Sequence, residues 1–297
     1  MIRLALRVPK ADAELVLAEL LTVAPAGCEE REVDGQTVEF ALYGAPGELP
    51  ALPQLQARVG SALVSVSARE VRDDWAERWR DFHRPVLIAA PSAGRALPGR
   101  AGAVERSLYV RPPWAPALDP SAGAIELVID PGQAFGTGAH ASTRLSLELL
   151  LQVRAEGQPG SALDIGTGSG VLAIAARALG YAPVVAIDND RLALAAATSN
   201  AARSGVAIEL QRCDIRRQRL PLPSRAAGSL LVTANLLRPL LLDLAERIEL
   251  RATTLILSGL LDEEAEEVAE RFVARLGARL RARRSAEGWS ALLLAVP

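Results

Sequence analysis

The chain of 297 residues has few cysteines and histidines, the residue types that build disulfide frameworks and many metal centres, and it has no excess of basic residues. It has two cysteines and two histidines, and Cys28 and Cys213 show neither a metal-ligand spacing nor a disulfide pattern. Lys10 is the only lysine, and the 33 basic residues are outnumbered by 35 acidic ones. Proteins that mainly bind nucleic-acid phosphates usually carry a basic excess, so we expect no metal site and no direct requirement for nucleic acid.

Long apolar runs are also missing, since none approaches the ~20 residues that a membrane helix needs. Met1 leads directly into the alternating segment 2–8, which predicts a strand and not a signal peptide. Hydrophobic residues make up 50% of the chain and charged residues 23%, a composition typical of a globular protein. The length predicts about two domains. We therefore expect a soluble, cytoplasmic monomer that makes no membrane contact.

Residues 1–68 are predicted to form a small α+β domain, because strand and helix periodicities follow one another in the order strand, helix, strand, strand, helix, strand. The expected strands are 2–8, 27–33, 37–43 and 61–67, and the expected helices are 11–23 and 48–59. Asp34-Gly35 predicts a hairpin turn. This order is that of a ferredoxin-like fold. No residue in it looks catalytic, so we interpret it as a substrate-recognition domain, with a structural appendage as the alternative.

Residues 69–124 are predicted to be a linker helix with connecting loops. The segment 71–82 carries aromatic residues at helical spacing, namely Trp75, Trp79 and Phe82. Such a stripe predicts an amphipathic helix that packs between the two domains or, alternatively, contacts the substrate. The segments 89–103 and 115–124 are rich in glycine, proline and alanine and are expected to be loops on either side of a short strand at 108–110.

Residues 125–297 show strands that alternate with helices, which predicts a parallel, doubly wound α/β sheet. The expected strands are 125–129, 161–165, 184–187, 207–212, 229–234, 253–258, 278–284 and 289–296. The expected helices are 143–153, 171–179, 191–203, 238–249 and 261–276. No helix is expected between the last two strands, so they should form an antiparallel hairpin that closes the sheet.

The strongest chemical signal is the glycine loop in the segment 163–170, LDIGTGSG, which follows a strand and opens a helix. The pattern Gly-x-Gly-x-Gly differs from the dinucleotide fingerprint, because Val171 stands where a third glycine or alanine is required. The next strand ends at Asp188, at the distance expected of an acid that accepts hydrogen bonds from ribose hydroxyls. The alternative for Asp188 is a helix N-cap, although Asp190 is better placed for that role. Together these features predict a nucleoside ligand with an anionic group, such as S-adenosylmethionine.

Three segments, one of which contains the glycine loop, resemble those of a known family. Residues 130–140 read DPGQAFGTGAH, residues 163–176 read LDIGTGSGVLAIAA, and ANLL at 234–237 is followed by LILSGLLDEEAEEV at 255–268. These segments are similar to those of class I methyltransferases, specifically the family of lysine methyltransferases of ribosomal protein L11 (PrmA). The chain departs from the family pattern at Ala139, Ala141 and Ser142, and its loops at 89–103 and 115–124 look longer than usual.

The resemblance implies a Rossmann-like methyltransferase domain over 125–297 that uses S-adenosylmethionine. It implies cofactor contacts from Thr143, Gly166, Asp188 and Asn235. Thr143 can offer its hydroxyl or be a simple helix cap, and Asn235 can contact the methionine end, orient the incoming amine or be a turn residue. The implied substrate is ribosomal protein L11, free or within the ribosome, methylated on lysine or N-terminal amines.

No arrangement of nucleophile and base is visible in the sequence, and the catalytic residue stays unassigned. His140 is interpreted as a structural residue or hydrogen-bond partner, with a general base as the alternative. Two other functions stay open from the residues. One is a methyltransferase of another acceptor, such as another protein lysine or a nucleobase, although Leu236 and Leu237 replace the Pro-Pro that amino-methylating nucleic-acid enzymes often carry after the asparagine. The other is a non-catalytic cofactor-binding protein.

Overall fold

The computed structural model divides the chain into two compact units, Met1–Phe82 and His83–Pro297. It describes residues 2–13, 16, 20, 28–44, 49, 65–70, 83–89, 107–131, 138, 140–223, 230–250 and 253–297. The helix predicted at 71–82, nearly all of the helix predicted at 48–59 and most of the loop predicted at 89–103 lie outside the described residues. In the part of the chain that is described, the structure has no helix long and apolar enough to cross a membrane.

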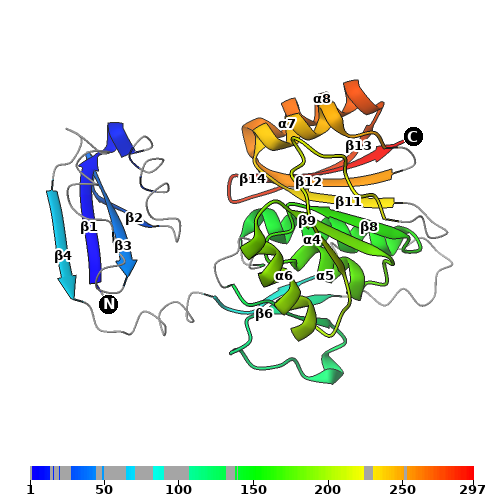
Figure 1. The fold of residues 1–297 in the computed structure, drawn as a ribbon, viewed down its shortest axis with the longest axis horizontal. Coiled ribbons are helices and arrows are strands. Elements are labelled where there is room, and N and C mark those ends of the chain that lie inside the picture. Colours follow the sequence, from blue (N-terminus) through cyan, green and yellow to red (C-terminus); the bar gives the residue numbers. More distant parts are fainter. Residues whose placement is uncertain are drawn as a thin grey trace. The chain divides into compact units, whose positions relative to one another are not determined.

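The first unit contains an antiparallel sheet of four strands in the order β2-β3-β1-β4 (Figure 1). The strands are β1 (Ile2–Pro9), β2 (Glu29–Asp34), β3 (Thr37–Gly44) and β4 (Ser65–Glu70). This strand order agrees with the ferredoxin-like pattern predicted from the sequence, whose helices at 11–23 and 48–59 lie mostly outside the described residues. One face of the sheet buries alternate residues such as Leu6 and Phe40 in a core that includes Val16 and Leu20, and on β3 the Glu39 carboxylate forms ion pairs with Arg3 and Arg7 of β1.

The second unit is built on a seven-stranded sheet in the order β10-β9-β8-β11-β12-β14-β13. Its strands are β8 (Ser161–Ile165), β9 (Val184–Asp188), β10 (Glu209–Arg212), β11 (Leu230–Asn235), β12 (Thr253–Leu261), β13 (Arg279–Ala286) and β14 (Trp289–Val296). The first five of these in the sheet order run parallel, and β14 pairs antiparallel with both β12 and β13. The doubly wound sheet and its closing hairpin are therefore confirmed.

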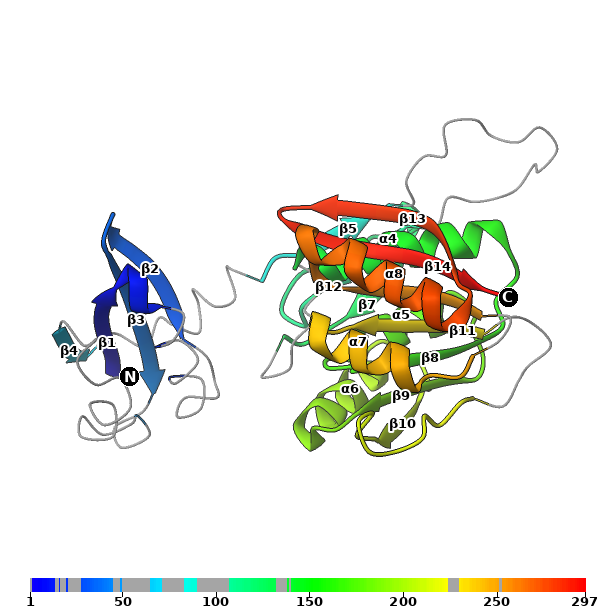
Figure 2. The ribbon, with the colours of Figure 1, turned by 90° about the horizontal axis from the view of Figure 1, so that it is seen from above.

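Helices cover both faces of this sheet, and Figure 2 shows α7 and α8 crossing one of them. The helices are α4 (Ala141–Glu156), α5 (Val171–Ala178), α6 (Arg191–Arg203), α7 (Arg238–Arg247) and α8 (Ala265–Leu276). Because successive side chains of a strand point to opposite faces, each buried strand contributes to two cores. On β11, Leu231 belongs to the core with α4 and α5, whereas Val232 belongs to the core with α7 and α8.

Helix α8 starts later than the sequence suggested, at Ala265 instead of 261. Strand β12 continues to Leu261 through a register shift at Gly259, and the acidic residues Asp262–Glu264 form a 3-10 turn before the helix. The acidic residues Asp262–Glu264 give no indication of this register shift in the sequence, because the shift depends on the pairing of β12 with its partner strand.

A separate three-stranded sheet, in the order β5-β6-β7, packs on the side of α4 and α5 that faces away from the large sheet. Its strands are β5 (Val86–Ile88), β6 (Leu108–Arg111) and β7 (Ile125–Val128). The strand predicted at 125–129 thus belongs to this small sheet and not to the doubly wound sheet. Likewise, β5 and β6 belong to the second compact unit, although we expected residues 69–124 to be a linker.

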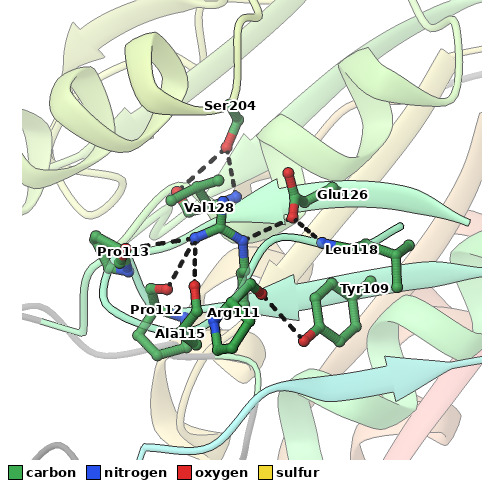
Figure 3. Close-up of polar contacts among 10 residues, drawn as sticks. Tyr109, Arg111, Pro112, Pro113, Ala115, Leu118, Glu126, Val128 and Ser204 are labelled. Carbon is green, nitrogen blue, oxygen red and sulfur yellow. Dashed lines mark hydrogen bonds and ion pairs between the residues drawn. The ribbon is translucent and has the colours of Figure 1, made fainter. Parts of the chain in front are cut away.

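Arg111 organises the end of this small sheet (Figure 3). Its Nε donates to Glu126 Oε1 at 2.7 Å, and its terminal nitrogen donates to the carbonyl oxygens of Pro112 and Ala115 at 3.3 and 3.0 Å. Glu126 Oε1 also accepts from the Leu118 N–H at 2.8 Å. A single guanidinium therefore holds the proline-rich segment after β6 against β7, the strand that leads toward α4.

The packing of α8 on the sheet is tested by two adjacent substitutions. Phe272 is fully buried, whereas Val273 on the same helix is 43% exposed. We expect Phe272→Ala to lower the free energy of unfolding by about 3–5 kcal/mol, because it leaves a cavity, and Val273→Ala to lower it by less than about 0.5 kcal/mol. Denaturant titration followed by circular dichroism measures both. Equal losses in the two variants would contradict the assignment of this helix face to the core.

Candidate active site

A cavity of about 660 Å³ lies at the carboxyl edge of the large sheet. Its walls include Gly166 after β8, Asp188 at the end of β9 and Asn235 at the end of β11. In the sheet, β9, the next strand along the chain, lies on one side of β8, while β11 lies on its other side. The cavity therefore sits where the strand order reverses. Ligands bind at this position in open α/β sheets, and the volume suits a small molecule.

The glycine loop is shaped by hydrogen bonds within the protein. The N–H groups of Gly166 and Thr167 both donate to the Ile187 carbonyl oxygen at 2.9 Å, and the Gly170 N–H donates to the Thr167 carbonyl at 2.8 Å. Gly166 and Gly170 have φ values of +69° and +87°, which glycine adopts without strain. These N–H groups are therefore already used, and the loop contributes the shape of the wall more than free donors for a ligand.

The Asp188 carboxylate is bound to the backbone on both of its oxygens. Oδ2 accepts from the Gly168 N–H at 3.0 Å, and Oδ1 accepts from the Asp190 N–H at 3.0 Å. Each carboxylate oxygen can accept a further hydrogen bond, so an acceptor stays available on the cavity side. Asp190 is the N-cap of α6, where its side chain accepts from the Leu192 N–H at 2.9 Å. The structure therefore excludes the N-cap alternative for Asp188.

Asn235 and Thr143 lie together although 92 positions separate them in the sequence. The Asn235 Nδ2 donates to Thr143 Oγ1 at 3.3 Å, and Thr143 is fully buried in the first turn of α4. Asn235 is the last residue of β11 and lines the cavity, so it is not a turn residue. In the structure, Thr143 is connected to the site through its hydrogen bond with Asn235.

Gly259 gives the Asn235 amide its space, a role that sequence reasoning missed. A Cβ atom at Gly259 would lie 2.6 Å from the Leu236 carbonyl oxygen and 2.8 Å from Asn235 Oδ1, and the φ of Gly259 is +82°. Both distances are shorter than any real Cβ contact, so only glycine fits here. The sequence contains the glycine, but only the pairing of β11 with β12 brings it beside Asn235.

His140 serves as the N-cap of α4, which begins at Ala141. Its Nδ1 accepts from the Ser142 N–H at 3.3 Å, and its ring meets the ring of Trp289 edge to face at 4.7 Å between centroids. Burial lowers the pKa of His140, and the positive charge of Arg144 lowers it further. The structural interpretation of His140 is therefore supported, and the alternative of Thr143 as the helix cap is wrong.

Asp164 lies beneath the glycine loop and was also missed by sequence reasoning. It is 2% exposed, and its carboxylate accepts from the hydroxyls of Thr167 at 2.7 Å and Thr233 at 2.6 Å. Burial raises the pKa of Asp164 to about 6, although both hydroxyls oppose this shift. An acidic residue inside the apolar strand 161–165 was the available signal, since such a residue is rarely buried without partners.

Asp214 and Cys213 complete the wall beyond Asp188. Asp214 follows β10 and accepts from the Arg216 N–H at 3.0 Å, and its carboxylate lies 3.5 Å from the Arg217 guanidinium. Asp214 lies two residues after β10, the neighbour of β9, and is therefore at the same edge of the sheet as Asp188. This position was a signal in the sequence that our prediction did not use. Among the described residues, no group of three or more histidine, cysteine or acidic side chains is arranged to hold a metal ion.

Comparisons with known proteins agree on one family. The sequence model for ribosomal protein L11 methyltransferase (PrmA) matches residues 29–296. A ribosomal protein L11 methyltransferase of Sorangium cellulosum is 32% identical over 89% of this chain and 80% of its own length, and one of Vibrio cholerae is 34% identical over 80% and 75%. The crystal structure of ribosomal protein L11 methylase from Lactobacillus delbrueckii is 29% identical, covers 64% of this chain and 94% of its own, and has a TM-score of 0.53.

The raised pKa of Asp164 predicts how stability depends on pH. The pKa is about 6 in the folded protein and 3.8 ordinarily, so the contribution of this group is full below about pH 4 and is lost as the pH rises through about 6. Relative to Asp164→Asn, which does not titrate, the wild type should lose about 3 kcal/mol of unfolding free energy over that window. Denaturant titrations from pH 4 to pH 7 measure the difference.

The two hydroxyl partners provide the control for this pH dependence. Thr233→Val removes one hydrogen bond that favours the charged form of Asp164. This variant should move the window to higher pH. A difference between wild type and Asp164→Asn that is constant over the whole range would contradict the burial argument.

Proposed function

The chain belongs to the ribosomal protein L11 methyltransferase (PrmA) family, and we propose that it transfers methyl groups from S-adenosylmethionine to lysine and N-terminal amines of ribosomal protein L11. The observation that carries the proposal is the Asp188 carboxylate on the wall of a cavity that also includes Gly166 and Asn235. A carboxylate at the end of the second strand and a glycine loop after the first are what a nucleoside needs, because ribose presents two hydroxyl donors.

We assign the cofactor contacts by chemistry and position along the cavity. Asp188 accepts from the ribose hydroxyls, and Asp214, one strand further from β8, is the available acceptor for the amino group of the base. Gly166 lets the backbone approach the methionine part. Thr143 acts through the amide of Asn235, which it holds by a hydrogen bond of 3.3 Å. The apolar residues Ile165, Val171 and Leu172 of the same wall suit the flat face of a base and the methylene groups of the methionine part.

Bound S-adenosylmethionine supplies an already activated methyl group, so the residues of the chain contribute position and desolvation. A lysine amine has an ordinary pKa of about 10.4 and must be neutral to react. The apolar side chains of Leu236 and Leu240 on the cavity wall disfavour the charged ammonium form. Because Asn235 Nδ2 is engaged with Thr143, Asn235 Oδ1 is the atom that accepts a hydrogen bond from the incoming amine and orients its lone pair.

We assign the remaining features of the protein to the same reaction. Residues 1–68 recognise ribosomal protein L11 and residues 125–297 carry the methyltransferase site, while the part of 69–124 that follows His83 belongs to the same compact unit as that site. The ferredoxin-like sheet offers a recognition surface, and the described residues that line the cavity lie between 165 and 240. We further propose that the enzyme acts as a cytoplasmic monomer on ribosomal protein L11, free or in the ribosome, without requiring nucleic acid.

Asp188→Ala tests the cofactor assignment. The loss of two charge-assisted hydrogen bonds to the ribose should weaken S-adenosylmethionine binding by at least about 100-fold, as measured by calorimetry. Asp119→Ala is the control, because it removes an exposed N-cap aspartate that does not line the cavity and should leave the affinity within about twofold. Unchanged affinity in Asp188→Ala would refute the ribose assignment.

Deletion of residues 1–66 tests the recognition assignment. Because the described residues that line the cavity lie between 165 and 240, the truncated enzyme should bind S-adenosylmethionine within about twofold of the full chain. It should no longer methylate ribosomal protein L11, which mass spectrometry of the substrate reveals. Methylation at the full rate would show that recognition resides elsewhere in the chain.

A further inference from the structure

One buried side chain outside the cavity joins the glycine loop to the segment that follows β7. Asn200, on α6, is 1% exposed. Its Oδ1 accepts from the Asp130 N–H at 2.9 Å, and its Nδ2 donates to the Ser169 carbonyl oxygen at 2.9 Å. A longer contact of 3.4 Å runs from Nδ2 to the Asp130 carbonyl. The amide thus uses both of its ends on backbone groups: the oxygen binds Asp130, and the nitrogen binds Ser169 at the shorter of its two distances.

Both segments are connected to the candidate active site, one through the glycine loop and the other through the start of α4. Asp130 follows β7 and begins the stretch that leads to α4, where Thr143 holds Asn235. Ser169 belongs to the glycine loop, between Gly168, which donates to Asp188, and Gly170. Neither segment is paired with the other in a sheet. Asn200 is therefore a direct bridge between them, made by one side chain.

The same face of α6 also supports the glycine loop by close packing. A Cβ atom at Gly170 would lie 3.0 Å from the Cβ of Ala197, so the loop rests directly on α6 one turn before Asn200. Ala197 is fully buried. The helix therefore positions the loop by an apolar contact at one turn and by a hydrogen bond at the next. The Asn200 side chain also reaches the Asp130 backbone, while the Asp130 carboxylate pairs with Arg203 of the same helix at 3.1 Å.

We propose that Asn200 is a positioning residue for cofactor binding: it sets the spacing between the segment that begins at Asp130 and the glycine loop, and thereby the affinity for S-adenosylmethionine. The proposal rests on the function proposed above. Asn200 does not line the cavity, so it acts through the backbone of its two partners. Its effect should fall on the cofactor and leave the affinity for ribosomal protein L11 unchanged.

The C-terminal end of α6 offers a matched control. Ser204 Oγ accepts from the Val128 N–H at 3.0 Å and donates to the Val128 carbonyl at 3.2 Å (Figure 3). Like Asn200, Ser204 ties the region of β7 to α6 through two backbone hydrogen bonds. In contrast to Asn200, the hydrogen bonds of Ser204 do not reach the glycine loop. Ser204→Ala should therefore lower stability without affecting the cofactor.

The experiment compares Asn200→Ala, Asn200→Asp and Ser204→Ala in the full-length protein. Asn200→Ala removes both links, whereas Asn200→Asp keeps an acceptor for the Asp130 N–H and places an oxygen against the Ser169 carbonyl. Calorimetry with S-adenosylmethionine should show about tenfold weaker binding in both Asn200 variants, because both lose the buried hydrogen bond to the Ser169 carbonyl oxygen. In Ser204→Ala the affinity should change by no more than about twofold. Steady-state kinetics should show a raised KM for S-adenosylmethionine and an unchanged KM for ribosomal protein L11.

Hydrogen exchange of the glycine-loop amides, measured without ligand, separates this proposal from the assignment of function. Exchange should be faster than in the wild type in Asn200→Ala and Asn200→Asp but not in Ser204→Ala. If Asn200→Ala does not fold, Asn200→Asp decides by the same readouts. Lower melting temperatures with unchanged cofactor affinity in the Asn200 variants, or an equal loss of affinity in Ser204→Ala, would overturn the proposal. A wild type that binds no S-adenosylmethionine would refute the proposed function, while unchanged exchange in the Asn200 variants would refute the bridge itself.

Discussion

The hydrogen bond between the Gly168 N–H and the Asp188 carboxylate joins the ends of two neighbouring strands, and the cavity depends on it. Strands β8 and β9 are parallel and in register, so the glycine loop and the acidic residue leave the sheet at the same edge. The loop then turns back over β9, where two of its N–H groups donate to the Ile187 carbonyl. This path needs left-handed backbone at Gly166 and Gly168, which explains why glycine is required. Loop shape and carboxylate position are thus one structural unit.

The opposite wall depends on a second set of contacts, which α4 brings to the ends of β11 and β12. Ser146 Oγ of α4 lies 2.5 Å from Ser258 Oγ of β12, and both residues are fully buried. One turn earlier on the same helix, Thr143 holds the amide of Asn235. The helix is thereby attached to two neighbouring strands, and the hydrogen bond with Thr143 restrains the Asn235 side chain, which lines the cavity. A side chain held in this way has lost part of its conformational freedom before any ligand binds.

Two buried polar residues near the site, Asp164 and Asn200, have hydrogen-bond partners within the protein. Asp164 accepts from two threonine hydroxyls, and Asn200 uses both ends of its amide on backbone groups. An unpaired polar group in these places would be costly, whereas a satisfied one fixes the backbone to which it is bound. This arrangement fits an enzyme whose reactive group arrives with the cofactor. The chain then needs accurate placement of backbone and amide more than a nucleophile of its own.

The amino-acid sequence by itself determined the element order, the ferredoxin-like and doubly wound patterns, and the pairing of the glycine loop with Asp188. These features follow from periodicities of a few residues and from spacing along one βαβ unit, which local physical chemistry sets. The tertiary structure decided the rest: His140 as the cap of α4, the separate sheet that contains β7, the space that Gly259 leaves for Asn235, and the bridge through Asn200. Apart from the helix cap, which is local, each of these joins residues that are distant in the sequence, and such contacts depend on strand register and helix packing that no local pattern encodes.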